Sequence, residues 1–429
     1  MILKIVLTSA VFTLLFMVII NFLLPKELRV KYIFEPFLML ILTVASVIGM
    51  QVSLAIFNFN KFYDSIIGFV YFFTFLSTIY FLRIIFSKRF SIKTVKNLGR
   101  SRSIENICKA SIWRKKRLFL GVYLLTLVYL LYAIKKNFEL ISEGVMHGTN
   151  LKLYNENNLE KLFNYFDSHV AGFFVFFTII FFFLSKFKIR RILIFIFSLS
   201  LLVKFGTTLS RASFISLFFL ISPIAIIYAR KRLNYLFLAV FPLFLTFGLI
   251  IAPTTADKLE DYLLLVRRIF LNSDFSLWFR FYDYLRFEDF RHYNYYYYFY
   301  TIFSKFFDLG FYSGLGPYIV SLYNSNNSGN GPIPTFYYEF LILFKGHPFA
   351  LVLHAILYGA MFFLGRLYSL VLLNNLSSYL HIALFYYFYF ILPKVFGDYF
   401  LFSIASIFYI TILILPYVFL SITFRKNKI

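Results

Sequence analysis

The sequence predicts an all-α polytopic membrane protein with about eleven transmembrane helices, and three observations lead to this. Of its 429 residues, 61% are hydrophobic and only 14% are charged, whereas soluble proteins carry about 25% charged residues. Apolar runs near the roughly 20 residues that cross a bilayer recur along the chain. Basic residues gather in alternate breaks between these runs. A soluble globular enzyme is therefore excluded, and residues 1–429 are expected to form a single integral membrane domain.

The apolar runs place the predicted spans in order along the chain. They lie near residues 2–24, 33–57, 63–86, 118–134, 169–185, 192–207, 212–229, 235–252, 349–365, 379–396 and 399–423. The total can range from ten to thirteen, because only charged breaks mark the ends of the shorter runs. No small-residue cleavage site follows the first run, so we expect an uncleaved span there and not a secretory signal peptide.

The basic clusters predict the orientation, because loops rich in Lys and Arg face the cytoplasm. The clusters are Lys26, Arg29 and Lys31; the run from Lys88 to Arg117; Lys186, Lys188, Arg190 and Arg191; Arg230, Lys231 and Arg232; Arg366; and Arg425, Lys426 and Lys428. With eleven spans, the carboxyl terminus is then cytoplasmic and the amino terminus is outside. The basic loop 87–117 is expected to lie against anionic lipid headgroups. The net charge of +24 is therefore an orientation signal, and no nucleic-acid partner is implied.

Two hydrophilic segments, 135–168 and 253–336, are expected on the extracytoplasmic face. The first lacks the spacing of acidic or histidine residues that holds a metal, so we interpret it as a structural cap. The second is 84 residues long, far longer than a connection between adjacent helices, and loops of that length are usually functional. The active-site region is therefore predicted in 253–336, with no metal among its ligands.

Arginines in this long segment are candidates for binding a diphosphate. A helical pattern over about 276–308 places Arg280, Tyr284 and Arg291 on one face, with the two arginines about 16 Å apart along the axis. A guanidinium group matches phosphate oxygens and stays charged in a partly dry site, which makes Arg280, Arg286 and Arg291 candidates. The alternative is that these arginines pair with neighbouring acidic residues or reach lipid phosphates.

Two residues near the start of the next span are candidates for a general base. Glu339 lies between Tyr338 and Phe340, where an acid is costly unless it is paired or faces water. His347 is the second candidate, because an imidazole titrates near neutral pH. A structural pair between Glu339 and an arginine remains the alternative. Arg211, in an outward break between two apolar runs, should have an anionic partner for the same energetic reason.

Four short motifs, in this order, resemble those of a known family. They are SRAS at 210–213, WFRFYDYL around Arg280, GLGP at 314–317 and PTFYYEFLILFKGHPF from Pro334. Together with the topology, they resemble the polymerases of lipid-linked oligosaccharide repeat units, the O-antigen or capsule polymerases called Wzy, which are related to the O-antigen ligases. The ligases place a His-Asn pair where this chain has Asn330-Gly331, and that difference favours a polymerase.

The resemblance implies a membrane glycosyltransferase with a GT-C-like helical architecture in the bacterial cytoplasmic membrane. Such an enzyme transfers a glycan from undecaprenyl diphosphate to a second lipid-linked repeat unit, without a nucleotide or another cofactor. Its partners would be these lipid-linked oligosaccharides, membrane lipids and a regulator of chain length. The site residues on this view are Glu339, Arg280 and His347 for catalysis, and Arg211, Arg291, Arg286, Tyr284 and Gly316 for binding the substrate.

Three other functions stay open at this point: a ligase-type glycosyltransferase, a flippase or other transporter of the same lipid, and a structural membrane subunit. Transporters often contain repeated halves, and no internal repeat is evident in this sequence. A flippase also has little use for an 84-residue outward segment. These two features favour the enzyme over the transporter.

Overall fold

The computed structural model describes residues 2–57, 62–89, 105, 107–142, 170–185, 191–207, 211–228, 232, 234–235 and 347–393. Within these ranges the chain is helical and contains no strand, which confirms the all-α prediction for this part of the chain. The elements are α1 (Ile2–Leu23), α2 (Pro36–Ile56), α3 (Phe62–Arg89), the 3₁₀ turn η1 (Ser111–Arg114), α6 (Lys116–Ser142), α8 (Gly172–Leu184), α9 (Arg191–Thr207), α10 (Arg211–Ile227), α17 (Pro348–Asn374), α18 (Tyr379–Tyr386) and the π-helix η5 (Tyr387–Ile391).

Three of the described helices, α3, α6 and α17, are long and apolar enough to cross a membrane. Shorter apolar stretches occur in α1, α2, α8, α10 and α18–η5. Nine of the predicted spans correspond to these helices and to α9. The span predicted at 399–423, and all of 235–252 except Tyr235, lie outside the described residues, so the count of eleven stays a prediction.

Two helices, α6 and α17, extend eight and nine residues past the ends of the spans that the sequence predicts. Helix α6 continues to Ser142, so the first eight residues of the predicted segment 135–168 are helical. Helix α17 runs through Arg366 to Asn374. The prediction that Arg366 lies in a loop is therefore wrong. The charge is tolerated inside the helix because Arg366 is buried against an acidic partner, described below.

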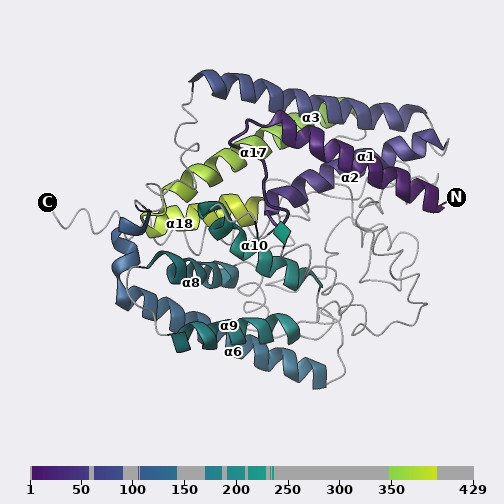
Figure 1. Ribbon diagram of the computed structural model, residues 1–429. Helices are drawn as coiled ribbons and strands as arrows, with labels where there is room; N and C mark the ends of the chain where they lie inside the picture. Colours follow the sequence, from purple (N-terminus) through teal and green to yellow (C-terminus); the bar gives the residue numbers. More distant parts are fainter. Residues whose placement is uncertain are drawn as a thin grey trace.

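The described helices pack in antiparallel and parallel pairs (Figure 1). Their buried residues form an apolar core rich in aromatic side chains. Helix α1 packs along α2, α3 along α17, and α6 along α8 and α9. The α1–α2 pair is especially close at Gly49, where an added Cβ would lie 2.6 Å from Thr13 Oγ1 and 2.8 Å from the Ser9 carbonyl oxygen. Small residues allow such approach between membrane helices, where burial of apolar surface supplies little attraction.

The helix ends next to the Lys- and Arg-rich segments lie together at one end of the bundle, where several hydrogen bonds connect them. Tyr228 Oη donates to the Phe183 carbonyl, Asn234 Nδ2 to Lys31, Trp113 Nε1 to Leu376 and Arg83 Nη1 to Leu23, at 3.0 to 3.1 Å. We call the segments 24–35, 107–117, 183–185, 228–235 and 374–378 the basic end. The alternation of basic breaks predicts this gathering. Which side of the membrane the basic end faces stays a prediction.

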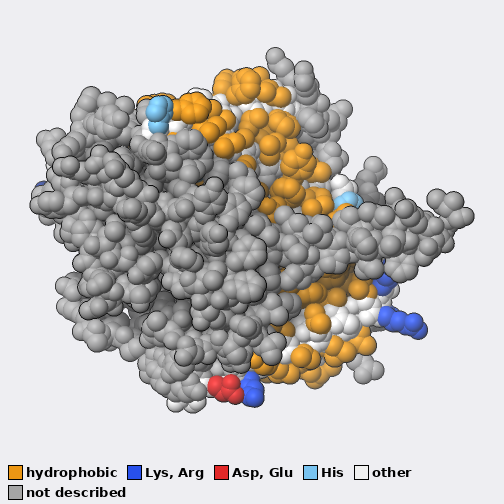
Figure 2. Space-filling model, turned by 180° about the vertical axis from the view of Figure 1, so that it is seen from behind, with side chains coloured by type: hydrophobic (Ala, Val, Ile, Leu, Met, Phe, Trp, Pro, Cys, Tyr) orange, Lys and Arg blue, Asp and Glu red, His pale blue; other side chains and the backbone are white. Residues whose placement is uncertain are grey.

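The outward surfaces of the helices are strongly apolar. On α1, Val11, Val18 and Phe22 are each about two-thirds exposed, and on α6 Val128 is 67% exposed. Figure 2 shows that hydrophobic side chains cover much of the described surface when the molecule is seen from behind. Exposed apolar area of this extent marks an interaction surface, and helices of this length and composition are compatible with a lipid bilayer.

Candidate functional site

The structure places two of the eight predicted site residues. Arg280, Glu339, Arg291, Arg286, Tyr284 and Gly316 lie outside the described residues. Arg211 is the first residue of α10, and His347 immediately precedes α17. Because six of the eight residues lie outside the described ranges, the structure does not test whether they form one site. The roles of all eight residues stay predictions.

Both placed residues lie at the end of the bundle opposite the basic end. Helix α10 has 17 residues and is thus about 25 Å long. The residue after its last turn, Tyr228, contacts Phe183 of the basic end. Helix α17 likewise runs from His347 to the 374–378 turn, where the Leu376 carbonyl accepts from Trp113. The starts of α10 and α17, which flank the segment 253–336 in the sequence, are therefore on the same side of the bundle.

His347 serves as the amino-terminal cap of α17. Its Nδ1 atom accepts a hydrogen bond from the backbone N–H of Phe349 at 3.2 Å, and Pro348 occupies the first helical position. A side-chain acceptor at this position satisfies one of the helix's unpaired N–H groups, and proline is favoured directly after it. In this geometry the Nδ1 lone pair of His347 serves the cap of α17. The role of His347 as a general base stays a prediction.

At the basic end, the structure reveals a buried ion pair that the sequence analysis missed. Arg366 Nη1 lies 2.6 Å from Glu35 Oε2, and the two side chains are 2% and 0% exposed. Arg366 also donates through Nε to the Leu28 carbonyl at 3.1 Å and through Nη2 to that of Arg29 at 3.4 Å. Its guanidinium group lies over the Phe37 ring, 5.3 Å from the centroid. The arginine thus joins α17 to the α1–α2 connection.

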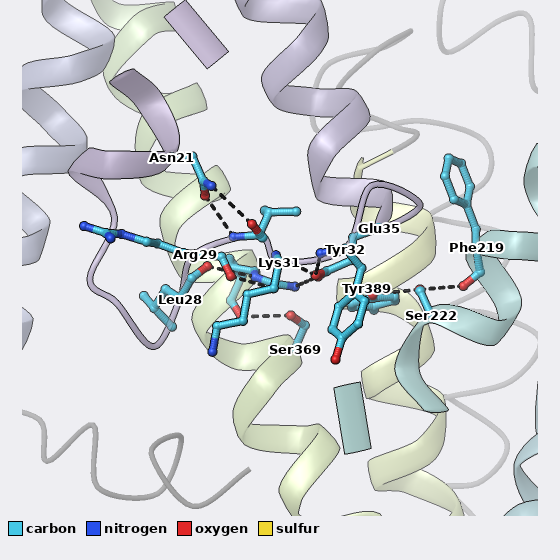
Figure 3. Close-up of polar contacts among 12 residues, drawn as sticks. Asn21, Leu28, Arg29, Lys31, Tyr32, Glu35, Phe219, Ser222, Ser369 and Tyr389 are labelled. Carbon is cyan, nitrogen blue, oxygen red and sulfur yellow. Dashed lines mark hydrogen bonds and ion pairs between the residues drawn. The ribbon is translucent and has the colours of Figure 1, made fainter. Parts of the chain in front are cut away.

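Glu35 organises the connection that receives this arginine (Figure 3). Its Oε1 atom accepts from the backbone N–H groups of Lys31 and Tyr32, each at 3.1 Å. Burial, and secondarily the Glu35 charge, raise the pKa of Tyr32 to about 12. The neutral phenol donates to the Ala225 carbonyl at 2.8 Å, so the same short connection is also held to α10.

Tyr389 extends this polar cluster to the π-helix η5. Its hydroxyl lies 2.8 Å from that of Ser222 on α10, and its ring lies 6.1 Å from that of Phe37. Figure 3 shows Tyr32, Glu35, Tyr389 and Ser222 converging where the α1–α2 connection, η5 and α10 meet. Nη1 of Arg366 and Oε2 of Glu35 are in ionic contact with each other, and the Nε, Nη2 and Oε1 atoms bond to the backbone of the α1–α2 connection. We therefore interpret the cluster as a structural junction.

A second buried polar group lies deeper between α3 and α17. His354 is 1% exposed, its Nδ1 atom lies 2.9 Å from the Tyr71 hydroxyl, and its ring stacks on that of Tyr358 at 5.6 Å. Ionisable residues at membrane depth are rare and are usually paired in this way. Sequence periodicity does not single out His354, because it occupies one position of an otherwise apolar helix.

No protein-family model matches the chain, and no similar protein of known function or solved structure is found.

Proposed function

We propose that this protein is a membrane glycosyltransferase that polymerises oligosaccharide repeat units carried on undecaprenyl diphosphate. It acts on the outer face of the bacterial cytoplasmic membrane, with its amino terminus outside and its carboxyl terminus in the cytoplasm. The product is a surface polysaccharide of the O-antigen or capsule type. The basic end described above is the cytoplasmic end in this proposal.

The observation that carries the proposal is the order of the four motifs along a helical membrane chain. The motif around Arg211 precedes the segment 253–336, the motifs of Arg280 and Gly316 lie within it, and the motif of Glu339 and His347 follows it. The arrangement of α10 and α17 supports this order, because Arg211 and His347 begin helices on the same side of the bundle. All four motifs can then meet on one face.

The chemistry of the reaction explains why these residue types are needed. The leaving group is a membrane-bound diphosphate, and fixed cations stabilise the negative charge that develops on it. We assign this role to Arg280, assisted by Arg211, Arg286 and Arg291. A base must accept the proton of the attacking hydroxyl, and we assign it to Glu339, since His347 caps α17 through Nδ1. Tyr284 and Gly316 would contact the glycan.

Deletion of the protein followed by separation of the cell's surface glycans by size tests the proposal. We expect single repeat units in place of long chains, with long chains restored by the wild-type protein. Arg280→Lys should restore little, because an ammonium group cannot reproduce the two-point contact of a guanidinium group with phosphate. Wild-type chain lengths from Arg280→Ala, at a normal level of protein, would exclude the assigned role.

The same experiment separates the polymerase from its nearest alternative. Loss of a flippase would leave lipid-linked units on the cytoplasmic face, so that even single units would be missing from the surface. Loss of a polymerase leaves single units on the surface. The absence of any surface unit after deletion would therefore favour transport over polymerisation.

A further inference from the structure

Four consecutive cations are held in a fixed position where α6 enters the apolar part of the bundle. Arg114, Lys115, Lys116 and Arg117 end the turn η1 and begin α6, and all four side chains are exposed. None of them makes an ion pair with any residue that the structure describes. By contrast, the nearby Lys109 pairs with Glu105 at 2.6 Å. We call the four residues 114–117 the basic platform.

The platform is anchored by the residues directly before it. Trp113 is fully buried, and its Nε1 donates to the Leu376 carbonyl at 3.0 Å. Its ring packs edge-on against Phe181 at 5.0 Å, and Ile112 is buried beside it. A basic segment that only directs insertion needs charge and no fixed geometry. The anchoring of Trp113 therefore points to a surface that is used in the folded protein.

An apolar, outward-facing surface begins directly beyond the platform. On α6, Leu120 and Leu124 are each about half exposed, and on the neighbouring α9, Ile192 and Phe195 are more than half exposed. In Figure 2, Lys and Arg side chains project at the edge of the hydrophobic surface. Cations next to exposed apolar side chains match the two parts of a phospholipid, an anionic headgroup and its acyl chains.

We propose that the basic platform binds anionic phospholipid, with the phosphate groups on Arg114–Arg117 and the acyl chains on the exposed face of α6 and α9. Each Lys or Arg side chain near an anionic leaflet is attracted to it electrostatically, and this attraction falls off within a Debye length of the surface. The proposal is independent of the proposed enzymatic function, because it concerns the end of the bundle opposite Arg211 and His347.

A lipid titration of the purified full-length protein in neutral detergent tests this proposal. Phosphatidylglycerol should raise the Tm more than phosphatidylcholine at the same concentration, and the difference should shrink at high salt. Glycerol phosphate, which has the anionic group without acyl chains, should leave the Tm unchanged. An equal rise with glycerol phosphate would overturn the assignment to a lipid.

Charge-matched variants locate the effect on the platform. Lys115→Gln with Lys116→Gln should increase the half-saturating concentration of phosphatidylglycerol by about tenfold or more. The control is Lys4→Gln with Lys135→Gln, which removes two lysines near the opposite end and should leave the titration unchanged. Lys115→Arg with Lys116→Arg should bind as the wild type does.

A measurement on the wild type keeps the proposal testable if the glutamine variant does not fold. The protein is reconstituted with equal amounts of phosphatidylglycerol and phosphatidylcholine, and the lipids retained after extraction are counted by native mass spectrometry. Enrichment of phosphatidylglycerol is expected. Equal retention of the two lipids, or a glutamine variant that titrates as the wild type does, would show that the cations only direct insertion and would overturn the proposal.

Discussion

Glu35 and Arg366 are 331 positions apart in the sequence, yet their side chains meet at 2.6 Å in a fully buried ion pair. Because Arg366 also binds the Leu28 and Arg29 carbonyls, the pair fixes α17 against the connection between α1 and α2. A buried pair of this kind contributes less to net stability than to the choice of one arrangement, but removing one partner leaves an uncompensated charge.

Removing the charge of one partner should therefore lower the free energy of unfolding more than removing the charges of both partners. Arg366→Met leaves the Glu35 carboxylate buried and should lower the free energy of unfolding by about 3–5 kcal/mol. Adding Glu35→Gln should recover part of this loss, because the amide oxygen can still accept from the Lys31 and Tyr32 N–H groups. Chemical unfolding of the purified protein measures both changes.

The matched control for this pair is Arg232→Met, which removes an exposed arginine at the same end of the bundle and should change stability by no more than about 0.5 kcal/mol. The free energies of unfolding of the two single variants and the double variant are then compared. If the loss in the double variant equals the sum of the losses in Arg366→Met and Glu35→Gln, the two residues are not coupled and the proposed junction is wrong.

The second prediction tests the close packing of α1 and α2 by comparing alanine substitutions at two glycines. Gly49→Ala would place a methyl group 2.6 Å from Thr13 Oγ1 and 2.8 Å from backbone atoms of Ser9 and Thr13, and such overpacking costs about 1–3 kcal/mol. Gly121→Ala on α6 meets nothing within 4 Å and should be neutral or stabilising, since alanine favours a helix by about 1 kcal/mol over glycine. Thermal melts that rank the two variants in the opposite order would refute the close packing.

The orientation of the bundle gives a third prediction. Reporter fusions at Asn97 and Tyr235 should report the cytoplasm, and fusions at Asn155 and Asn326 the outside, because the basic segments alternate along the chain. Tyr235 belongs to the basic end, where its neighbour Asn234 binds Lys31. A cytoplasmic signal at Asn326 would place the segment 253–336 on the wrong face for the proposed reaction.

Capping and base catalysis by His347 make opposite demands, and this gives a fourth prediction. His347→Asn preserves a side-chain acceptor at the start of α17 and should keep both fold and activity, whereas His347→Ala should destabilise the protein by about 1 kcal/mol. Glu339→Gln should instead keep the fold and lower turnover by about two to four orders of magnitude. The two readouts are the melt and the rate with lipid-linked repeat units.

The roles of these two residues would exchange if the results were reversed. Normal turnover in Glu339→Gln, together with a stable but inactive His347→Asn, would assign the base to His347. A lowered melt in Glu339→Gln with a proportionate loss of activity would show that the carboxylate is structural, as expected for a broken buried pair.

The sequence predicts the helices of the described residues well, because long apolar runs are typical of helices that can cross a membrane. The orientation that the basic breaks indicate stays a prediction. The prediction of helix ends fails at Arg366, where a charged residue directly after the 17 residues of the predicted span 349–365 suggests the end of that span. The helix continues because Glu35, placed just before α2, neutralises the charge, and sequence patterns in one segment carry no information about a partner so far away. The sequence did contain one indication of this pair, because Glu35 and Arg366 carry opposite charges and both lie near span ends on the predicted cytoplasmic side.

The candidate site is predictable only as a set of motifs. The spacing of Arg280 and Arg291 predicts that they share one helical face, but local periodicity predicts nothing about their distance from Glu339. The capping role of His347 could have been foreseen, because the following Pro348 is typical of the first position of a helix. The buried contact of His354 could not have been foreseen, since the sequence of an apolar helix does not indicate which residue its one polar side chain will contact.

The central claim is that this protein joins lipid-linked repeat units, and the most direct measurement is polymerisation by the purified protein. The full-length protein is reconstituted in a bilayer and supplied with undecaprenyl diphosphate-linked repeat units alone, without nucleotide. We predict a ladder of products that grows by one repeat unit per step, with release of undecaprenyl diphosphate, and no ladder from Arg280→Ala of equal melting temperature. Intact substrate with the wild-type protein, under conditions in which its melt shows it to be folded, would contradict the account.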